Sequence, residues 1–408
     1  MLSCLKLRNC DITWKSPLLK GLKYLNIGMP SKNSRPKLAD WLDALGEMSQ
    51  LKLLNLQSAS PIAPPSPFDV ERTLTLPSLT CLDISASAKD VALALAHLNL
   101  PALTCLNVAV MSLNPVHTDA SVRNLLPYVA RHTHGPQDTV PLQSVLVLDH
   151  EGPNTSYLFV LAWSVSDIDA EVHDPPALLG ATLFPRVTLA IESKGWASSR
   201  THREILDMVM EALPLDGLVM LAAQGLCISS YLANDLSMPQ FWLRHAPHWP
   251  LLRRVRLATP VVRGFLQMLL EDNGERERPL LPSLTELVVH NESSSGLSEL
   301  PIYDTLIKRV EQGVPLDMLD LRMCYHDNNS RAGVQLFSEI VVNVLGPILD
   351  NESSESSERM RSMWEALALG LFIENDISGG AADDSETDDD GDSDDSDTGG
   401  GEGEDEGW

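Results

Sequence analysis

The residues most able to do chemistry in this sequence are its cysteines. Cys4, Cys81 and Cys105 occupy the same position of three similar segments, LSCL, LTCL and LTCL. Thiols that recur in one position could line up across neighbouring strands, where they would bind a metal or undergo oxidation. However, no CxxC pair occurs, and Tyr24 and Leu53 fill the same position in two related segments. We therefore favour packing of a repeated sequence over a metal or redox site.

The six cysteines also indicate a cellular setting. Their spacing does not form the dense framework of a small disulfide-bonded domain. Free thiols in a reducing compartment are the better interpretation, which predicts an intracellular protein, cytoplasmic and/or nuclear. Cys10 and Cys324 occupy a different position, where we expect a buried side chain to bond the backbone of a turn.

Histidine pairs offer a second possible chemistry. His132 and His134 are two residues apart, and His245 and His248 are three apart. A zinc site needs four convergent ligands, and no cysteine or acidic cluster accompanies either pair, so we expect exposed loop histidines and no metal. No nucleophile elbow, phosphate-binding loop or H-E-x-x-H motif occurs, so the sequence predicts no catalytic residue, no cofactor and no enzyme.

Charge excludes two classes of partner. The 408 residues include 56 acids and 30 bases, for a net charge of −26. Sixteen of the acids and no lysine or arginine lie in residues 374–408, which leaves 40 acids and 30 bases elsewhere. A chain this negative lacks the clustered bases that nucleic acids and anionic membranes require, so we expect neither as a partner. Residues 373–408 are too poor in apolar side chains to fold, which predicts a disordered acidic tail.

Leucine organises the rest of the chain, since it accounts for 67 residues, about one in six. The segment Leu2-x-x-Leu5-x-Leu7-x-x-Cys10-x-Ile12 matches the leucine-rich-repeat frame L-x-x-L-x-L-x-x-N/C-x-L. Seven more good copies begin at Leu22, Leu51, Leu79, Leu103, Leu252, Leu284 and Leu316. Degenerate copies end in Leu146-x-Leu148, Leu189-x-Ile191 and Leu218-x-Met220. The starts are unevenly spaced, so the repeats are irregular.

Each frame predicts a short strand whose fifth position points away from the core. That position is mostly polar, and we predict that its residues form a partner-binding surface: Lys6, Asn26, Asn55, Asp83, Asn107, Arg256 and Asp320. Val147, Ala190, Val219 and Val288 break the rule, three of them in the degenerate copies. The middle of the array is therefore expected to be covered on both faces.

Amphipathic helices are predicted between the strands. Apolar residues recur at helical spacing in residues 37–48, 89–98, 119–131, 201–213, 262–271 and 303–312, with Asp119 and Thr201 as expected N-caps. Alternation of strands and helices predicts an α/β fold, a curved leucine-rich-repeat-like solenoid with concave strands and convex helices over residues 1–327. Residues 328–372, with helices at 330–349 and 359–372, are expected to form a C-terminal helical cap.

Several phrases also resemble a known family. Residues 2–13 (LSCLKLRNCDIT) resemble the cysteine-containing leucine-rich repeat of F-box proteins, and residues 249–273, 280–289 and 308–324 resemble the fungal F-box-like proteins. The resemblance implies the substrate-recognition part of an SCF-type ubiquitin ligase, whose solenoid holds a protein target. No F-box segment is found in these residues, so we expect the ligase adaptor as a partner only if such a segment lies upstream.

Two further functions stay open beside that one. A stand-alone leucine-rich-repeat protein would bind its target without recruiting a ligase. A GTPase-activating protein of the Ran type also combines a leucine-rich solenoid with an acidic tail, but its asparagine ladder is replaced here by Ala59, Ser87 and Met111. An acidic histone chaperone is less favoured, because its tail is usually longer and denser in acid.

Overall fold

The computed structural model describes most of the first 346 residues. The described ranges are 2–28, 35–61, 72–113, 118–134, 141–151, 155–164, 185–194, 198–223, 239–271, 279–290, 301–322, 324 and 335–346. All of them belong to one compact unit, Met1–Arg361. The expected helix at 359–372 and the expected acidic tail lie outside the described residues.

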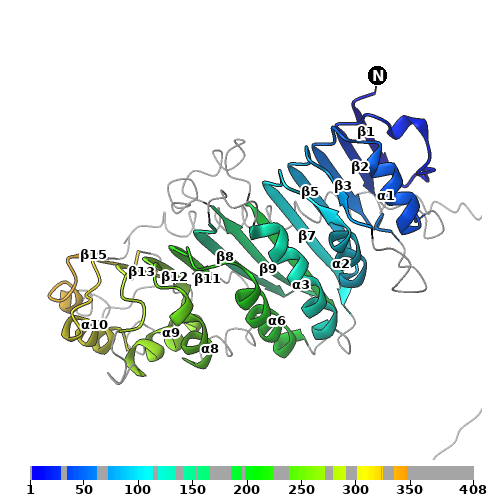
Figure 1. The fold of residues 1–408 in the computed structure, drawn as a ribbon. Coiled ribbons are helices and arrows are strands. Elements are labelled where there is room, and N and C mark those ends of the chain that lie inside the picture. The colour runs from blue at the N-terminus through cyan, green and yellow to red at the C-terminus, as the bar shows by residue number, and fades with distance from the viewer. Residues whose placement is uncertain are drawn as a thin grey trace, which may run out of the picture. The chain divides into compact units, whose positions relative to one another are not determined.

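A mixed α/β fold is built around one large sheet of thirteen strands (Figure 1). In spatial order these are β1 (Cys4–Arg8), β2 (Tyr24–Gly28), β3 (Leu53–Gln57), β5 (Cys81–Ala86), β7 (Cys105–Leu113), β10 (Val187–Lys194), β9 (Thr155–Trp163), β8 (Ser144–Glu151), β11 (Met220–Ala223), β12 (Arg254–Ala258), β13 (Glu286–His290), β14 (Met318–Asp320) and β15 (Asn343–Leu345). Every neighbouring pair is parallel except the two pairs that include β9. A separate parallel pair joins β4 (Leu74–Thr75) to β6 (Leu98–Asn99). All eight good leucine frames are therefore confirmed as strands.

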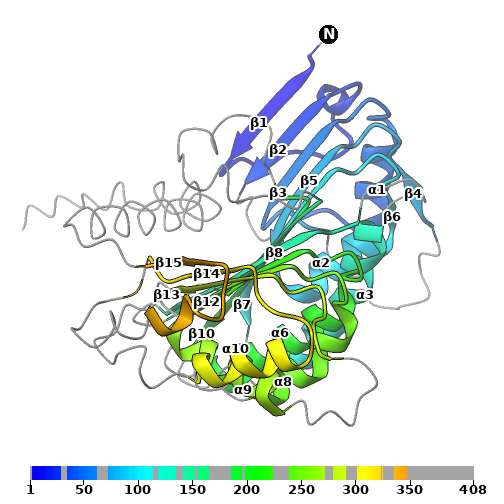
Figure 2. The same cartoon turned by 90° about the vertical axis from the view of Figure 1, so that its left-hand side faces the viewer.

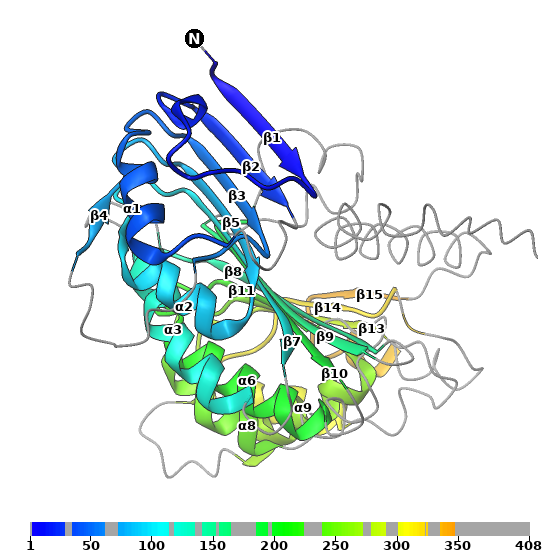
Figure 3. The same ribbon diagram turned by 90° about the vertical axis from the view of Figure 1, so that its right-hand side faces the viewer.

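Helices cover one face of this sheet, as Figures 2 and 3 show from opposite sides. They are α1 (Leu38–Gly46), α2 (Ala88–Ala96), α3 (Thr118–His134), α6 (Ser198–Ala212), α8 (Pro239–His245), α9 (Thr259–Glu271) and α10 (Ile302–Glu311), with short 3-10 turns η1 (Pro17–Leu19) and η3 (Ala246–His248). The six predicted helices are confirmed. The predicted caps are wrong, because Asp119 and Thr201 lie inside α3 and α6. Helix α8 was not predicted, since seven residues are too few to display helical periodicity.

The inner face of the sheet is the one that packs against the helices, and leucine fills it. The fourth and sixth positions of the frames, such as Leu54, Leu82 and Ile84, are fully buried in the main core. Burial of each such side chain stabilises the fold by roughly 2 kcal/mol relative to leaving it in water. The predicted alternation of inward leucine and outward polar residue is therefore correct for the strands on the β1 side of the sheet.

A recurring pair of backbone hydrogen bonds sets the register between repeats. The N–H groups of Lys52 and Leu53 both donate to the carbonyl of Lys23, and those of Thr80 and Cys81 both donate to the carbonyl of Lys52. The same pair recurs on the carbonyls of Ser3, Thr80, Gln143, Val219, Arg253 and Thr285. Strands β2, β3, β5, β7, β11, β12, β13 and β14 therefore each start from the carbonyl that precedes a neighbouring strand, which aligns equivalent positions of these strands.

The middle of the sheet departs from sequential order. Strand β10, and not β8, lies beside β7, and β8 lies beside β11. Strands β8, β9 and β10 thus form an antiparallel meander whose spatial order, β10-β9-β8, is the reverse of their order in the sequence. We expected three consecutive degenerate repeats here, and β9 was not predicted. Its sequence, TSYLFVLAW, is apolar on both faces, which is typical of a strand buried on both sides and gives no period-two signal.

The C-terminal end of the described sheet corrects a further prediction. Residues 330–349 were expected to be a helix, but β15 lies within this range and pairs in parallel with β14. The sheet thus continues past residue 328, where the solenoid was predicted to end and the helical cap to begin. The amide of Asn343 donates to the carbonyl of Asp317, the same type of contact that starts the earlier strands.

A buried arginine stabilises one of the turns that lead into a strand. Arg309 of α10 is 1% exposed, and its guanidinium donates to the carbonyls of Leu280, Leu281 and Leu284 at 3.4, 3.2 and 3.0 Å. Leu281 has a positive φ of 48°, which a leucine rarely adopts. The arginine therefore satisfies carbonyls that this strained turn would otherwise leave buried without donors.

Replacing this arginine should weaken the fold. We expect Arg309→Leu to lower the free energy of unfolding by about 3 kcal/mol, because three buried carbonyls lose their charged donor. Urea unfolding followed by circular dichroism measures the change. Arg123→Leu, at an exposed position on α3, is the matched control and should be near neutral. Equal losses for the two variants would contradict this role of Arg309.

Candidate functional site

The outer face of the sheet, opposite the described helices, carries the seven residues predicted to bind a partner. Strand register places one residue from each strand in a single central row. From β1 to β15 the central row is Lys6, Asn26, Asn55, Asp83, Asn107, Thr188, Leu161, Leu146, Ala222, Arg256, Val288, Asp320 and Leu345. All seven predicted residues thus lie in one row, but four apolar or small residues divide them into two groups.

The first group forms a polar sector on the five strands from β1 to β7. Lys6 is exposed, and Asn26, Asn55, Asp83 and Asn107 are half-buried. Neighbouring strands lie roughly 4.8 Å apart, so the sector spans about 19 Å. This is the only part of the central row, among the described residues, where five successive strands present polar side chains.

Hydrogen bonding within the polar sector is incomplete. Asn55 Nδ2 donates to Asp83 Oδ2 at 3.0 Å. The Oδ1 atoms of Asn26 and Asn55, and Oγ1 of Thr188 further along the row, are buried and have no partner among the described residues. Unpaired buried acceptors cost about 1–3 kcal/mol each.

Apolar and thiol side chains border the polar sector. Tyr24, 43% exposed, and Leu53, half-buried, occupy the row beside it. Aromatic residues beside polar ones are typical of the side chains that carry binding energy at protein interfaces. The same row continues with Cys81 and Cys105, which are register partners on β5 and β7 and are half-buried.

The two thiols contact each other and differ in acidity. A hydrogen bond from Cys105 lowers the pKa of Cys81, against the opposing effects of burial and of the Asp83 carboxylate. The same hydrogen bond, burial and the negative charges of Cys81 and Asp83 raise the pKa of Cys105. Asn107 Oδ1, 3.7 Å from Cys105 Sγ, is a second acceptor that the single S–H of Cys105 can reach. The sequence pattern identified the position that Cys81 and Cys105 share in their frames. The two thiols lie side by side only because β5 and β7 are neighbouring strands.

The middle of the outer face is apolar and buried. Leu146, Phe159, Leu161, Trp163 and Ala190 are each less than 5% exposed although the described helices lie on the other face. The expected burial of both faces in the middle of the sheet is therefore confirmed, but the frame assigned to residues 146–148 is wrong, because Val147 lies in the inner core and Leu146 lies in the outer row. This apolar middle separates the polar sector from Arg256 by five strand steps, roughly 24 Å.

The second group of predicted residues is buried, which corrects the expectation that the fifth frame position is solvent-exposed there. Arg256 and Asp320 are 6% and 5% exposed. Asp320 accepts hydrogen bonds from Arg322 Nε and Nη2 at 3.0 and 2.6 Å, and it forms an ion pair with Arg322. Burial opposes ionisation of Asp320, but the hydrogen bonds and charge of Arg322, with help from Arg256, lower its pKa overall.

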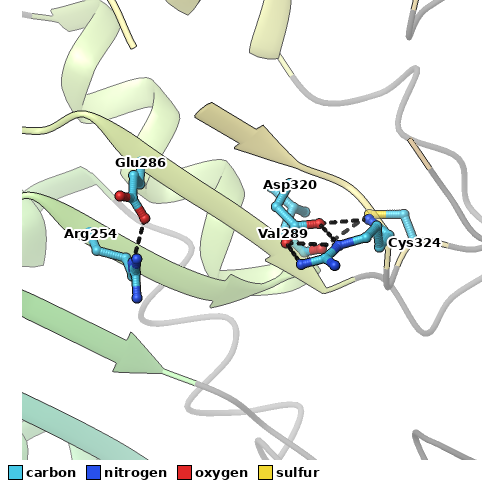
Figure 4. A network of polar contacts seen from close by, with 6 residues as sticks. Arg254, Glu286, Val289, Asp320 and Cys324 are labelled. Carbon is cyan, nitrogen blue, oxygen red and sulfur yellow. Dashed lines mark hydrogen bonds and ion pairs between the residues drawn. The ribbon is translucent and has the colours of Figure 1, made fainter. Parts of the chain in front are cut away.

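Figure 4 shows the polar contacts around this second group. Arg254 and Glu286, register partners on β12 and β13, form an ion pair. Cys324 is buried and its thiol donates to the carbonyl of Val289 at 3.2 Å, which confirms the predicted bond to backbone. Cys10, by contrast, is exposed, so the same prediction is wrong there. It follows β1, the strand at one edge of the described sheet.

Two histidines expected in exposed loops are buried in helices. His132 of α3 is 8% exposed, its Nε2 lies 3.2 Å from the carbonyl of Leu95, and burial lowers its pKa. His245 of α8 is 2% exposed and contacts Asp207 Oδ1 at 2.9 Å, while Arg244 contacts the other oxygen of Asp207 at 2.8 Å. These contacts tie α8 to α6, and they have a structural role.

The described part of the chain contains neither a candidate metal-binding cluster nor a candidate membrane-spanning helix. No group of three or more histidine, cysteine or acidic side chains there could hold a metal ion. Among the same residues, no helix combines the length and the apolar character that crossing a bilayer would require.

Comparison with known proteins adds no assignment. No family model matches the chain. No curated protein matches it in sequence. The functional argument therefore depends on the outer face of the sheet and on the sequence itself.

The charge on Asp320 makes a testable contribution to stability. Its pKa is lower in the folded chain than the unfolded value of about 3.9, so its carboxylate stabilises the fold above that pH. This contribution disappears as the pH falls through the folded value. We expect Asp320→Asn to cost about 1–2 kcal/mol at neutral pH and progressively less as the pH falls below about 3.9.

Urea unfolding of both proteins across this pH range measures the effect. Asp317→Asn is the matched control, because Asp317 is exposed next to the same strand and should change little at any pH. A stability difference for Asp320→Asn that is independent of pH would contradict the role of the charge.

Proposed function

We propose that the protein is a leucine-rich-repeat-like binding protein and that the polar sector of the outer face recognises a protein target. In this proposal the strands from β1 to β7 form the concave surface of a solenoid, and the helices form its convex side. The regular part of the sheet supports that description, because successive frames there lie side by side in parallel register.

One observation carries the proposal: the change in the outer face along the central row. From Lys6 to Asn107 the row is polar and at least partly accessible, whereas from Leu161 to Ala222 it is apolar and buried. The carboxylate of half-buried Asp83, beside the amides of Asn55 and Asn107, suits a target that supplies N–H donors or a cationic side chain.

The size of the polar sector limits the partner. The polar sector is five strands wide, and a second row borders it, formed by Tyr24, Leu53, Cys81 and Cys105. Together they form a patch suited to an extended segment or one edge of a folded domain. A specific, stable complex buries about 800 Å² on each partner. In a tight complex the target would therefore also contact residues outside the polar sector.

The resemblance to fungal F-box-like proteins supports a more specific role. In that role the outer face holds a substrate for an SCF-type ubiquitin ligase, and an F-box segment would bind the ligase adaptor. Mapping the 5′ end of the transcript tests this part. An upstream reading frame encoding an L-P-x-E-type helix would support ligase recruitment, and a frame that starts at Met1 would favour a stand-alone binding protein.

Binding through the polar sector is tested by a double substitution. We expect Asp83→Lys combined with Asn107→Trp to reduce capture of the target from an extract of the source cells by more than tenfold, because one substitution reverses a charge and the other blocks the face. Quantitative mass spectrometry of proteins bound to the immobilised chain measures the change.

Exposed residues on the helices supply the matched control. Lys89→Glu combined with Glu211→Lys reverses two charges on α2 and α6, and capture should be unchanged. Both double variants should melt within a few degrees of the parent chain, which separates loss of binding from loss of the fold. Equal capture by the parent and the outer-face variant would refute the assignment.

A further inference from the structure

The outer face holds two neighbouring thiols, Cys81 and Cys105, whose reactivity does not depend on a bound target protein. Cys81 and Cys105 are in register on the neighbouring parallel strands β5 and β7, so their side chains lie side by side on the outer face, and each shifts the pKa of the other. Both are half-buried, so small reagents in solvent can reach them. We propose that Cys81 and Cys105 form a redox-active dithiol that hydrogen peroxide converts into a reversible disulfide.

Strand geometry allows the bond. Neighbouring strands lie roughly 4.8 Å apart, within the range of about 4.4–6.8 Å between the Cα atoms of a disulfide. The Cβ atoms of a disulfide lie roughly 3.5–4.5 Å apart, which two side chains that lean toward each other from neighbouring strands can reach. A disulfide that solvent can reach is also open to reduction.

The two thiols have different roles. Cys81 is the attacking group, because the hydrogen bond from Cys105 stabilises its thiolate and lowers its pKa. Cys105 keeps its proton, since burial and the nearby charges raise its pKa. This division provides one nucleophile and one resolving thiol within contact distance, which is the arrangement that redox-sensitive cysteines use.

The reaction balances with one molecule of peroxide. The Cys81 thiolate attacks one oxygen of hydrogen peroxide, the O–O bond breaks, and hydroxide leaves, so Cys81 becomes a sulfenic acid. The Cys105 sulfur then attacks the Cys81 sulfur, and the S–OH bond breaks. The hydroxide that leaves takes the Cys105 proton to give water. Two thiols and one peroxide thus yield one disulfide and two waters.

The remaining described cysteines are not equivalent to this pair. Cys4 lies in the same row, but Tyr24 and Leu53 separate it from Cys81 by three strand steps, roughly 14 Å. Cys10 is exposed and lies after the end of β1, and Cys324 is buried with its thiol bonded to the carbonyl of Val289. They serve as internal references for reactivity.

Oxidation would also change the polar sector. The S–H of Cys105 can reach Asn107 Oδ1, and a disulfide has no S–H to donate. Asn107 would then lose this donor. A regulatory consequence for the target depends on the proposed function, whereas the thiol chemistry does not.

Peroxide treatment of the full chain tests the proposal. After blocking of remaining thiols, trypsin leaves Cys81 in residues 73–89 and Cys105 in residues 90–123, because Lys89 separates them. We expect a disulfide-linked pair of these two peptides, lighter than their sum by two hydrogen atoms. Dithiothreitol or glutathione should reverse it. Cys81 should react about tenfold faster than Cys4.

Single substitutions distinguish the roles. Cys105→Ser should leave a sulfenic acid on Cys81 that dimedone traps, whereas Cys81→Ser should leave Cys105 reduced. A Cys4→Ser, Cys10→Ser double variant is the control and should still form the disulfide. Absence of the linked peptides, or equal oxidation of Cys105 in Cys81→Ser, would overturn the proposal. Far-ultraviolet circular dichroism confirms that each variant is folded.

Discussion

The shared backbone carbonyl at the start of most strands is the contact on which the rest of the sheet depends. Two successive amides of one strand converge on a single carbonyl of the strand before it, as Thr104 and Cys105 do on Thr80. Threonine side chains strengthen the contact, since Thr80 and Thr104 Oγ1 donate to the same carbonyls. A one-residue slip would exchange the inner and outer faces of a strand, and this double contact opposes it.

Because neighbouring strands keep the same register, equivalent residues are stacked on both faces of the sheet, with a different result on each face. On the inner face it stacks leucine on leucine, so that a continuous core forms behind the strands. On the outer face it stacks the residues on either side of each inward leucine, which brings Asn55 next to Asp83 and Cys81 next to Cys105. Side chains that are 24 or 28 residues apart in sequence thus become neighbours without any local motif.

Sequence patterns predicted the parts of this structure that repeat and missed those that do not. The leucine frame located eight strands because its period of two distinguishes the buried side chains from the outward ones. It could not predict the reversed order of β8, β9 and β10, because hydrophobic pattern specifies a strand and not its neighbour. The burial of Arg309, Arg256 and Asp320 was also missed. The carbonyls that Arg309 contacts come from a segment 25 or more residues away, and the local pairing of Asp320 with Arg322 leaves no periodic pattern in the sequence.

The reversed meander has a consequence for how the chain folds. Within the regular part, neighbouring strands bring together residues close in sequence, such as Cys81 and Cys105. Where the meander joins the rest, Leu106 pairs with Val187, 81 residues away, and Ser144 pairs with Met220, 76 residues away. Closing loops of this length costs entropy before any contact stabilises them. The strands on each side can therefore assemble as local units, and joining them across β10, β9 and β8 is the slow, cooperative event that completes the sheet.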